Sequence, residues 1–269
     1  MAQIELKEGR RAFGHDPEGY LHARPGYPQG LYQILIERCG LTAGAHTLEI
    51  GPGPGLATRR LIELGALPLT LVEPDPRLAR FLHDELAPLS AALDIRNAAF
   101  EDVVLPEAAY DLAVSASAFH WIEEAQGLEK IARLLRPGGW WAMWWNTFGS
   151  FSEDDEFHQA TRFLLKGIER SPAVGSNVRP QHALDVESRI GALRSIPTFR
   201  DISHEILRWK IVYNARQLRA LYATFSPIAL LPVEERTRIL DGIESVALRD
   251  FGDQVERWIQ TPLYLARKS

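Results

Sequence analysis

The chain is poor in cysteine and has no excess of basic residues. Cys39 is its one cysteine, so neither an internal disulfide nor a CxxC metal or redox site can form. The 30 Lys and Arg residues stand against 35 Asp and Glu residues, which gives a formal net charge of −5. Proteins that bind duplex nucleic acids usually present a basic surface, because phosphate neutralisation supplies much of their affinity. We therefore expect no nucleic-acid partner.

Long apolar runs are also missing. No segment approaches the roughly 18 consecutive apolar residues that suggest a transmembrane helix, and the polar start, residues 1–10, lacks the pattern of a signal peptide. These absences predict a cytoplasmic protein without a membrane partner. The 269 residues are 46% hydrophobic and 24% charged, which is typical of a globular chain that forms one large α/β domain.

Short apolar runs alternate with longer periodic segments between residues 46 and 145. The short runs predict strands at 46–50, 69–73, 93–97, 110–115 and 140–145, and the periodic segments predict helices at 55–65, 76–87 and 123–139. Alternation of this kind indicates a parallel sheet with right-handed crossovers, in which helices cover both faces.

The pattern changes after residue 145. Residues 153–193 read as helices that begin at a capping-type sequence, 152–155, and are interrupted by a loop at 171–180. An extended segment at 199–213, a helix from Asn214, a helix at 233–251 and a final strand at 254–269 follow.

A glycine-rich loop follows the first predicted strand, where doubly wound sheets bind ligands. It reads Glu49-Ile50-Gly51-Pro52-Gly53-Pro54-Gly55, a GxGxG spacing rather than the GxGxxG of dinucleotide-binding folds. Pro52 and Pro54 have no N–H, so two donors that a pyrophosphate would use are missing. The loop therefore favours an adenosyl ligand without phosphates over NAD; a tight turn without any ligand is the alternative.

An acidic residue ends the second predicted strand. Glu73 lies about 20 residues beyond the loop, where a carboxylate can accept hydrogen bonds from both hydroxyls of a ribose. The alternative is a surface glutamate in a turn before Pro74. The glycine loop upstream favours the ribose interpretation.

Together these motifs resemble class I S-adenosylmethionine (SAM)-dependent methyltransferases. The resemblance rests on Glu49–Gly55 with Thr58, Val72-Glu73-Pro74, Phe100-Glu101-Asp102, Tyr110-Asp111-Leu112 with Ser115–Trp121, and Leu135–Gly139. The N-terminal spacing Phe13, Tyr20 and Arg24–Pro28, the SASAFHW segment 115–121 and the closing TPLYLAR segment 261–267 are similar to the trans-aconitate-methyltransferase-like small-molecule group. No [DN]PP[YF] motif follows the fourth strand, which disfavours methylation of nucleic-acid amino groups.

The resemblance implies a Rossmann-like, doubly wound and mostly parallel sheet of seven strands in a single domain. Residues 1–41 would form a helical N-terminal lid, 42–148 the cofactor-binding core, 149–198 a helical cap over the acceptor site, and 199–269 strands and helices that complete the sheet. The implied activity is methyl transfer from SAM to an O, C or N atom of a small-molecule acceptor, with release of S-adenosylhomocysteine (SAH). We expect a monomer or homodimer.

The same resemblance implies a set of cofactor-binding residues: Tyr20, Arg24, Glu49, Gly51, Pro52, Gly53, Gly55, Glu73, Pro74, Phe100, Glu101, Ser115 and Ala116. A guanidinium can pair with the methionine carboxylate in a bidentate manner, and Arg24 is the candidate, unless it is a surface arginine. Phe119, Trp121 and Trp145 are expected to line the acceptor pocket. Because none of the histidines shows metal-ligand spacing, we expect no metal.

His120 follows the fourth strand, beside the expected position of the methyl group. Its ordinary pKa suits a general base at neutral pH. The alternative is a structural histidine that packs on Trp121. A carboxylate acceptor would need no base, and His120 would then only shape the pocket.

Other functions are compatible with the same motifs. A SAM-binding enzyme with non-methylating chemistry, of the cyclase or decarboxylase type, would carry the same cofactor site, and so would a catalytically silent SAM-binding protein. A nicotinamide-dependent oxidoreductase is disfavoured by the two prolines of the loop.

Overall fold

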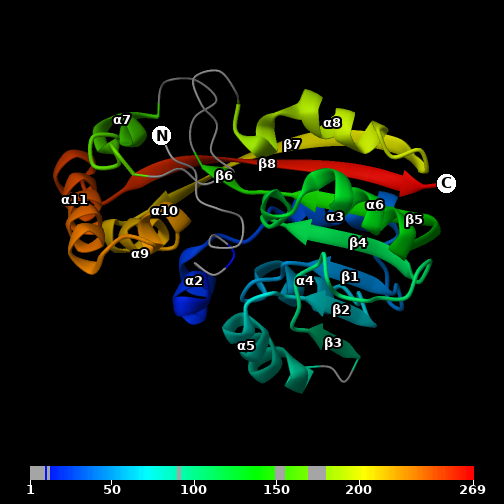
Figure 1. Ribbon diagram of the computed structural model, residues 1–269. Coiled ribbons are helices and arrows are strands. Elements are labelled where there is room, and N and C mark those ends of the chain that lie inside the picture. The colour runs from blue at the N-terminus through cyan, green and yellow to red at the C-terminus, as the bar shows by residue number, and fades with distance from the viewer. Residues whose placement is uncertain (1–9, 11–12, 90–91, 149–154, 169–179) are drawn as a thin grey trace.

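The computed structural model describes residues 10, 13–89, 92–148, 155–168 and 180–269. One sheet runs through this part of the chain, in the order β3-β2-β1-β4-β5-β8, with β7 on the free side of β8 and the short β6 continuing the side that β5 occupies (Figure 1). The strands are β1 (Thr47–Ile50), β2 (Leu69–Val72), β3 (Leu93–Arg96), β4 (Tyr110–Ala116), β5 (Leu135–Trp144), β6 (Thr147–Phe148), β7 (Phe199–Tyr213) and β8 (Val255–Lys268).

Strands β1 to β5 are parallel, and β8 is antiparallel to β5, β6 and β7. The predicted Rossmann-like, mostly parallel seven-stranded sheet is therefore confirmed. The short strand β6 is an addition that the sequence pattern did not predict. Strands β1 and β2 have four residues each, all of them buried, which explains why they read as continuous apolar runs.

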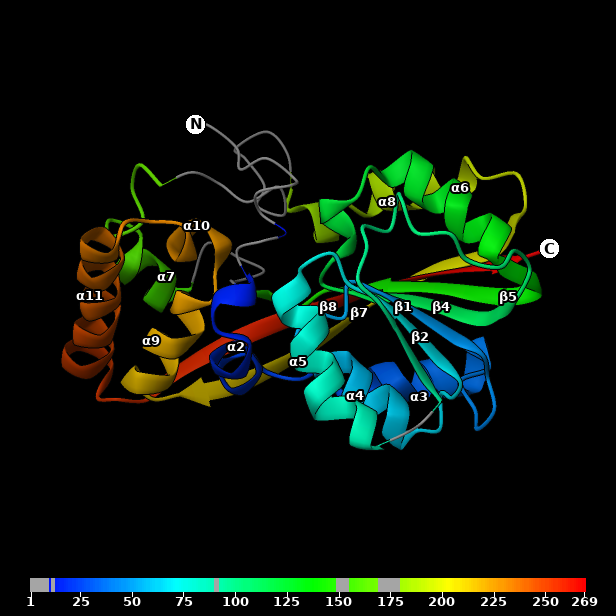
Figure 2. The same cartoon turned by 60° about the horizontal axis from the view of Figure 1, so that its bottom comes forward.

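Helices cover both faces of the sheet (Figure 2). On one face, α3 (Gln29–Cys39), α4 (Leu56–Glu63) and α5 (Pro76–Leu86) bury their apolar sides. On the other face, α6 (Glu124–Leu134) and α8 (Val186–Arg194) do so. The β5 tryptophans follow the alternation of a strand, since Trp141 packs on one face and Trp144 on the other.

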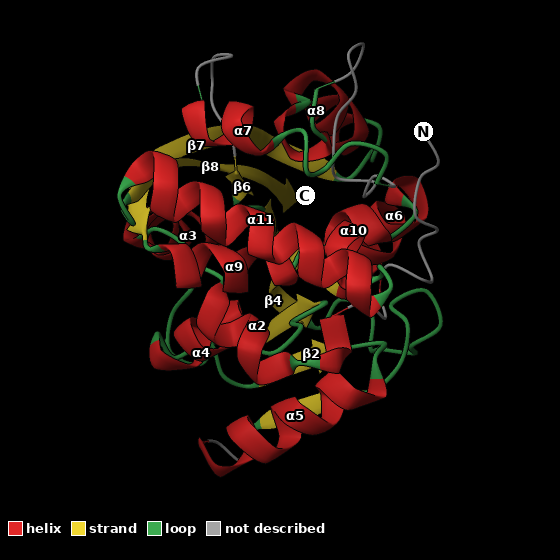
Figure 3. Ribbon diagram, turned by 90° about the vertical axis from the view of Figure 1, so that its left-hand side faces the viewer, coloured by secondary structure: helices red, strands yellow, loops and turns green. Residues whose placement is uncertain are grey.

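The long antiparallel pair of β7 and β8 extends past the parallel strands, and a third apolar cluster packs on it. This cluster is built on α9 (Ala215–Ala223), α10 (Ser226–Ala229) and α11 (Val233–Phe251), with α7 (Glu156–Thr161) packed on it through Phe157. Figure 3 shows α9, α10 and α11 in front of the sheet and close to α2 (Pro17–Ala23). The remaining elements are the short 3-10 helices η1 (Phe13–His15), η2 (Ala87–Leu89), η3 (Phe119–Trp121) and η4 (His182–Leu184).

Two predicted boundaries need correction. The helix predicted at 123–139 ends at Leu134, because buried Leu135 already pairs with Tyr110 in the β4–β5 ladder. The predicted insert at 153–193 contains only α7, η4 and α8 in the described residues, while most of its expected start and loop (152–154 and 171–179) lies outside them. Asp155 does cap α7, since its side chain accepts a hydrogen bond from the His158 N–H.

None of the helices in the described ranges is long and apolar enough to cross a membrane.

Candidate functional site

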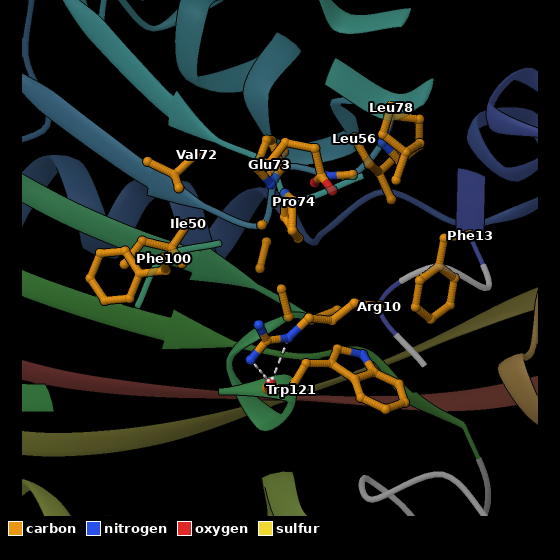
Figure 4. Close-up of a pocket in the computed structure, with 18 of the residues that line it drawn as sticks. Arg10, Phe13, Ile50, Leu56, Val72, Glu73, Pro74, Leu78, Phe100 and Trp121 are labelled. Atoms are coloured by element: carbon orange, nitrogen blue, oxygen red, sulfur yellow. Dashed lines mark hydrogen bonds between the residues drawn. The ribbon is translucent and has the colours of Figure 1, made fainter. Parts of the chain in front are cut away.

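A cavity opens where β1, β2 and β4 end, and Phe13 of η1 and Tyr20 of α2 also line it (Figure 4). It is lined by Arg10, Phe13, Tyr20, Tyr27, Ile50, Gly51, Pro52, Gly53, Pro54, Leu56, Ala57, Val72, Glu73, Pro74, Leu78, Phe100, Glu101, Ala116, Ser117, Ala118, Trp121 and Ile122. The cavity thus combines apolar walls with the glycine loop and two carboxylates, at the sheet edge where such folds bind ligands.

The backbone of the loop explains its glycines. Gly51, Gly53 and Gly55 have φ angles of +67°, +58° and +90°, a backbone conformation that residues other than glycine rarely adopt. A Cβ on Gly51 would also lie 2.5 Å from the Ala118 Cβ. At Gly51 the loop therefore lies against the segment after β4 with no space for a side chain, and Gly55 is the N-cap of α4.

Glu73 is the buried carboxylate of the cavity, with 3% of its surface exposed. Its Oε2 accepts a hydrogen bond from the Gly53 N–H at 3.0 Å, and its Oε1 accepts one from the Asp75 N–H at 2.9 Å. Burial raises the pKa of Glu73 to about 7, although these two hydrogen bonds oppose the rise. Each oxygen keeps a further lone pair, so the carboxylate can still accept two hydroxyls.

Glu49 lies behind the loop and does not line the cavity. Its Oε2 accepts a hydrogen bond from the Thr58 hydroxyl at 2.7 Å, while its Oε1 is buried without a partner in the described part of the chain. Burial raises the pKa of Glu49 to about 7, and the charge of Glu73 adds to this rise. A buried acceptor without a donor is costly unless a ligand or water supplies one.

Arg10 lines the cavity but is not among the site residues predicted from the sequence. It reaches across the cavity, where its Nε donates to the Trp121 carbonyl at 2.9 Å and its guanidinium pairs with Glu101 (Figure 4). Burial alone would raise the pKa of Glu101, but the hydrogen bond and charge of Arg10 hold it below its ordinary value. Nothing in the polar N-terminal sequence distinguishes Arg10 from its neighbour Arg11.

The predicted site residues divide into two groups. Those that line the cavity are Tyr20, Gly51, Pro52, Gly53, Glu73, Pro74, Phe100, Glu101, Ala116 and Trp121. Those that do not line it are Arg24, Glu49, Gly55, Ser115, Phe119, His120 and Trp145.

Several residues of the second group have structural tasks instead. The Ser115 hydroxyl donates to the Ile50 carbonyl at 2.9 Å and so holds the end of β1 to β4. Phe119, predicted to meet the acceptor, is fully buried and packs on Trp141, because the 3-10 turn after β4 directs it into the core. Its expected contact with the acceptor therefore needs correction.

Arg24 lies beside the cavity rather than on its wall. Its Nε donates to the Thr224 hydroxyl at 2.7 Å, and its guanidinium carbon lies 4.6 Å from the centre of the Phe225 ring and 5.2 Å from that of Tyr20. It has no ion pair with a carboxylate in the described residues. Its pairing with the methionine carboxylate stays a prediction.

His120 is placed differently from the predicted base. Its Nδ1 accepts a hydrogen bond from the Trp145 indole N–H at 3.0 Å, and its ring lies 4.9 Å from that of Trp121, which lines the cavity. Burial lowers the pKa of His120 to about 3, and the neighbouring His182 and Arg24 lower it further. The lone pair that a base would use is therefore already occupied.

The described residues contain no group of three His, Cys, Asp or Glu side chains able to hold a metal ion.

Comparison with known proteins now defines the class. Residues 48–143 match the model of the methyltransferase domain family, over the strands and loops that form the cavity. Together with the confirmed sheet order, this match identifies a class I SAM-dependent methyltransferase domain in this chain, and SAM is the cofactor of that family.

The individual relatives agree with this class. An uncharacterized methyltransferase of Mycobacterium tuberculosis is 28% identical over 235 residues, which cover 87% of this chain and 85% of that protein. A malonyl-[acyl-carrier protein] O-methyltransferase of Pseudescherichia vulneris is 30% identical over 60% of this chain and 61% of its own. A putative sarcosine dimethylglycine methyltransferase structure from Galdieria sulphuraria has the same fold, with a TM-score of 0.52, 15% identity, and coverage of 90% of this chain and 84% of that one.

The cavity fits SAM better than a dinucleotide. The Gly53 N–H already donates to Glu73, and the prolines at 52 and 54 have no N–H, so the loop has few donors left for a pyrophosphate. The buried Glu73 carboxylate would repel phosphate, whereas it can accept the hydroxyls of a ribose. Apolar Ile50, Val72 and Phe100 line the cavity near it.

Proposed function

We propose that this chain transfers the methyl group of SAM to an O, C or N atom of a small-molecule acceptor. The main support is the cavity itself, which brings the GxGxG loop and the buried Glu73 carboxylate together at the carboxyl ends of β1 and β2. When bound, SAM supplies a methyl group that is already activated by its sulfonium. The protein then has to align the acceptor and exclude water.

In this proposal the chain holds the cofactor along the cavity. Glu73 accepts the ribose hydroxyls, and Phe100 and Glu101 contact the adenine. Tyr20, which lines the cavity, and Arg24, which has no carboxylate partner in the described residues, hold the methionine end. Because Arg10 donates a hydrogen bond to Glu101, it must share this carboxylate with the adenine or release it when the cofactor binds.

The net charge of the chain and the sequence that follows β4 both support a small-molecule acceptor. The net charge of −5 offers little attraction for nucleic acids. The residues after β4 are Ser117-Ala118-Phe119 rather than the motif of enzymes that methylate the amino groups of bases. The Pseudescherichia relative is named for O-methylation of a malonyl group, so carboxylates belong among the acceptors to be tested.

Product analysis tests this function. The protein is incubated with SAM that carries an isotope-labelled methyl group and with a panel of small carboxylic acids, phenols and amines. We expect SAH release together with one acceptor that gains the labelled methyl. Conversion of an acceptor without gain of the label would indicate cyclase- or decarboxylase-type chemistry, and SAM binding without turnover of any panel member would indicate a silent SAM-binding protein. Either result would contradict the proposal.

A further inference from the structure

A second group of polar side chains lies next to the cavity and has no part in holding the cofactor. His120 in η3 and His182 in η4 have ring centres 6.1 Å apart. The ring of His182 lies 5.5 Å from that of Trp145, and the ring of His120 lies 4.9 Å from that of Trp121 on the cavity wall. His120 is therefore separated from the cofactor cavity by the Trp121 side chain, and His182 lies on the side of Trp145 and His120.

The hydrogen bonds of the two rings fix where their protons lie. An indole N–H and a guanidinium N–H can only donate. Because Trp145 donates to the Nδ1 of His120 at 3.0 Å, that atom carries no proton and the neutral ring has its proton on Nε2. Arg189 contacts the Nδ1 of His182 in the same way, at 2.6 Å, which places the His182 proton on Nε2 as well.

Neither Nε2–H group has an acceptor in the described part of the chain. The Nε2 of His182 is buried and has no partner in the described ranges. The Nε2 of His120 likewise has no hydrogen bond to the part of the chain that the structure describes. A buried donor without an acceptor costs stability, so the Nε2–H of His182 indicates a place for an oxygen atom from outside the chain. The partly buried ring of His120, whose centre lies 6.1 Å away, offers a second N–H donor beside it.

The surrounding charges favour a negative oxygen. The Glu124 carboxylate is held by Arg189 at 2.8 Å, and Asp185 is occupied as the N-cap of α8. Arg24 lies close enough to lower the pKa of His120 and pairs with no carboxylate in the described chain. Burial, the largest cause, also lowers the pKa of His182 to about 3, so both rings are neutral near pH 7.

We propose that the Nε2–H groups of His120 and His182 together bind an oxyanion of the acceptor, such as a carboxylate or a phenolate, and that neither histidine acts as a general base. Trp145 and Arg189 are positioning residues, since each fixes the tautomer of one histidine. The inference rests on the proposed methyl transfer and narrows its acceptor: the substrate must arrive ionised, because no base is free to deprotonate it.

Nuclear magnetic resonance on the full chain, with nitrogen-labelled histidine and SAH added, tests the tautomers. His120→Gln and His182→Gln assign the two signals. We expect both rings to be neutral with the proton on Nε2 between about pH 5 and pH 8. Trp145→Phe should allow the proton of His120 to move to Nδ1. An Nδ1–H form or an imidazolium in the unmodified protein would overturn the inference.

Benzoate serves as the oxyanion probe in the same samples, with benzyl alcohol as the neutral control. We expect saturable shifts of both Nε2–H signals with benzoate only. His120→Gln keeps an N–H donor near the Nε2 position and should bind benzoate within about threefold of the unmodified protein, whereas His120→Asn lacks it and should bind about tenfold more weakly. Equal effects of the two substitutions, or no response to benzoate, would overturn the inference. SAH binding in these samples keeps the two proposals separate, because its loss would instead contradict the proposed function.

Discussion

Glu73→Ala is expected to weaken SAH binding by at least about 30-fold, which corresponds to about 2 kcal/mol. Hydrogen bonds to a charged group contribute about 1.5–3 kcal/mol each, and the carboxylate would accept two from the ribose. The substitution also removes the acceptor that holds the Gly53 N–H, so the loop loses its tether to β2. Titration calorimetry of both proteins with SAH gives the affinities.

Glu63→Ala is the matched control, because its side chain is 61% exposed and makes only a surface ion pair with Arg60. Its SAH affinity should equal that of the unmodified protein. Glu73→Gln should resemble Glu73→Ala, since an amide nitrogen would face a backbone N–H that needs an acceptor. A Glu73→Ala affinity within about threefold of the control would show that Glu73 does not hold the ribose.

Gly51→Ala should have the second large effect, on both stability and binding. The new Cβ would meet the Ala118 Cβ at 2.5 Å in a backbone conformation with φ of +67°. Left-handed backbone costs about 1–2 kcal/mol and overpacking about 1–3 kcal/mol, so we expect a loss of about 3 kcal/mol in the free energy of unfolding. Relief of the clash would displace Gly51 or Ala118, both of which line the cavity, so SAH affinity should fall more than about tenfold.

Two other glycines calibrate this result in denaturant unfolding. A Cβ on Gly53 would have nothing within 4 Å, but its φ is +58°, so Gly53→Ala should cost about 1 kcal/mol through the backbone alone. Gly191 lies in α8 with open space around its Cβ position, so Gly191→Ala should be neutral or stabilising. If Gly51→Ala were no worse than Gly53→Ala, the close approach to Ala118 would not be important.

Local patterns explain why much of the fold and cofactor site could be predicted. The turn around Gly51 and the acid at 73 each depend on a few consecutive residues next to a buried strand, and the structure brings both to one cavity. The predicted helix end at residue 139 is wrong, because Leu135 pairs with the distant Tyr110 in the β-ladder and this pairing overrides the local helical pattern.

The environment of a side chain was harder to predict than its element. His120 was expected to be a base because of its position after β4, but its protonation depends on Trp145, Arg24 and His182, which come from other parts of the sequence. Arg10 was missed for a similar reason, since only the folded chain brings it to Glu101 and the Trp121 carbonyl.

The central claim is that the cavity around Glu73 binds SAM as a cofactor, and titration calorimetry with SAM, SAH and NAD tests it most directly. Because burial raises the pKa of Glu73 to about 7 in the free protein and only the carboxylate accepts two hydroxyls, binding should release a proton below this pH. We predict that SAM and SAH bind and NAD does not, and that SAH affinity rises about tenfold from about pH 6 to about pH 8. Binding of NAD in place of SAM and SAH, or an SAH affinity that falls over this range, would contradict the account.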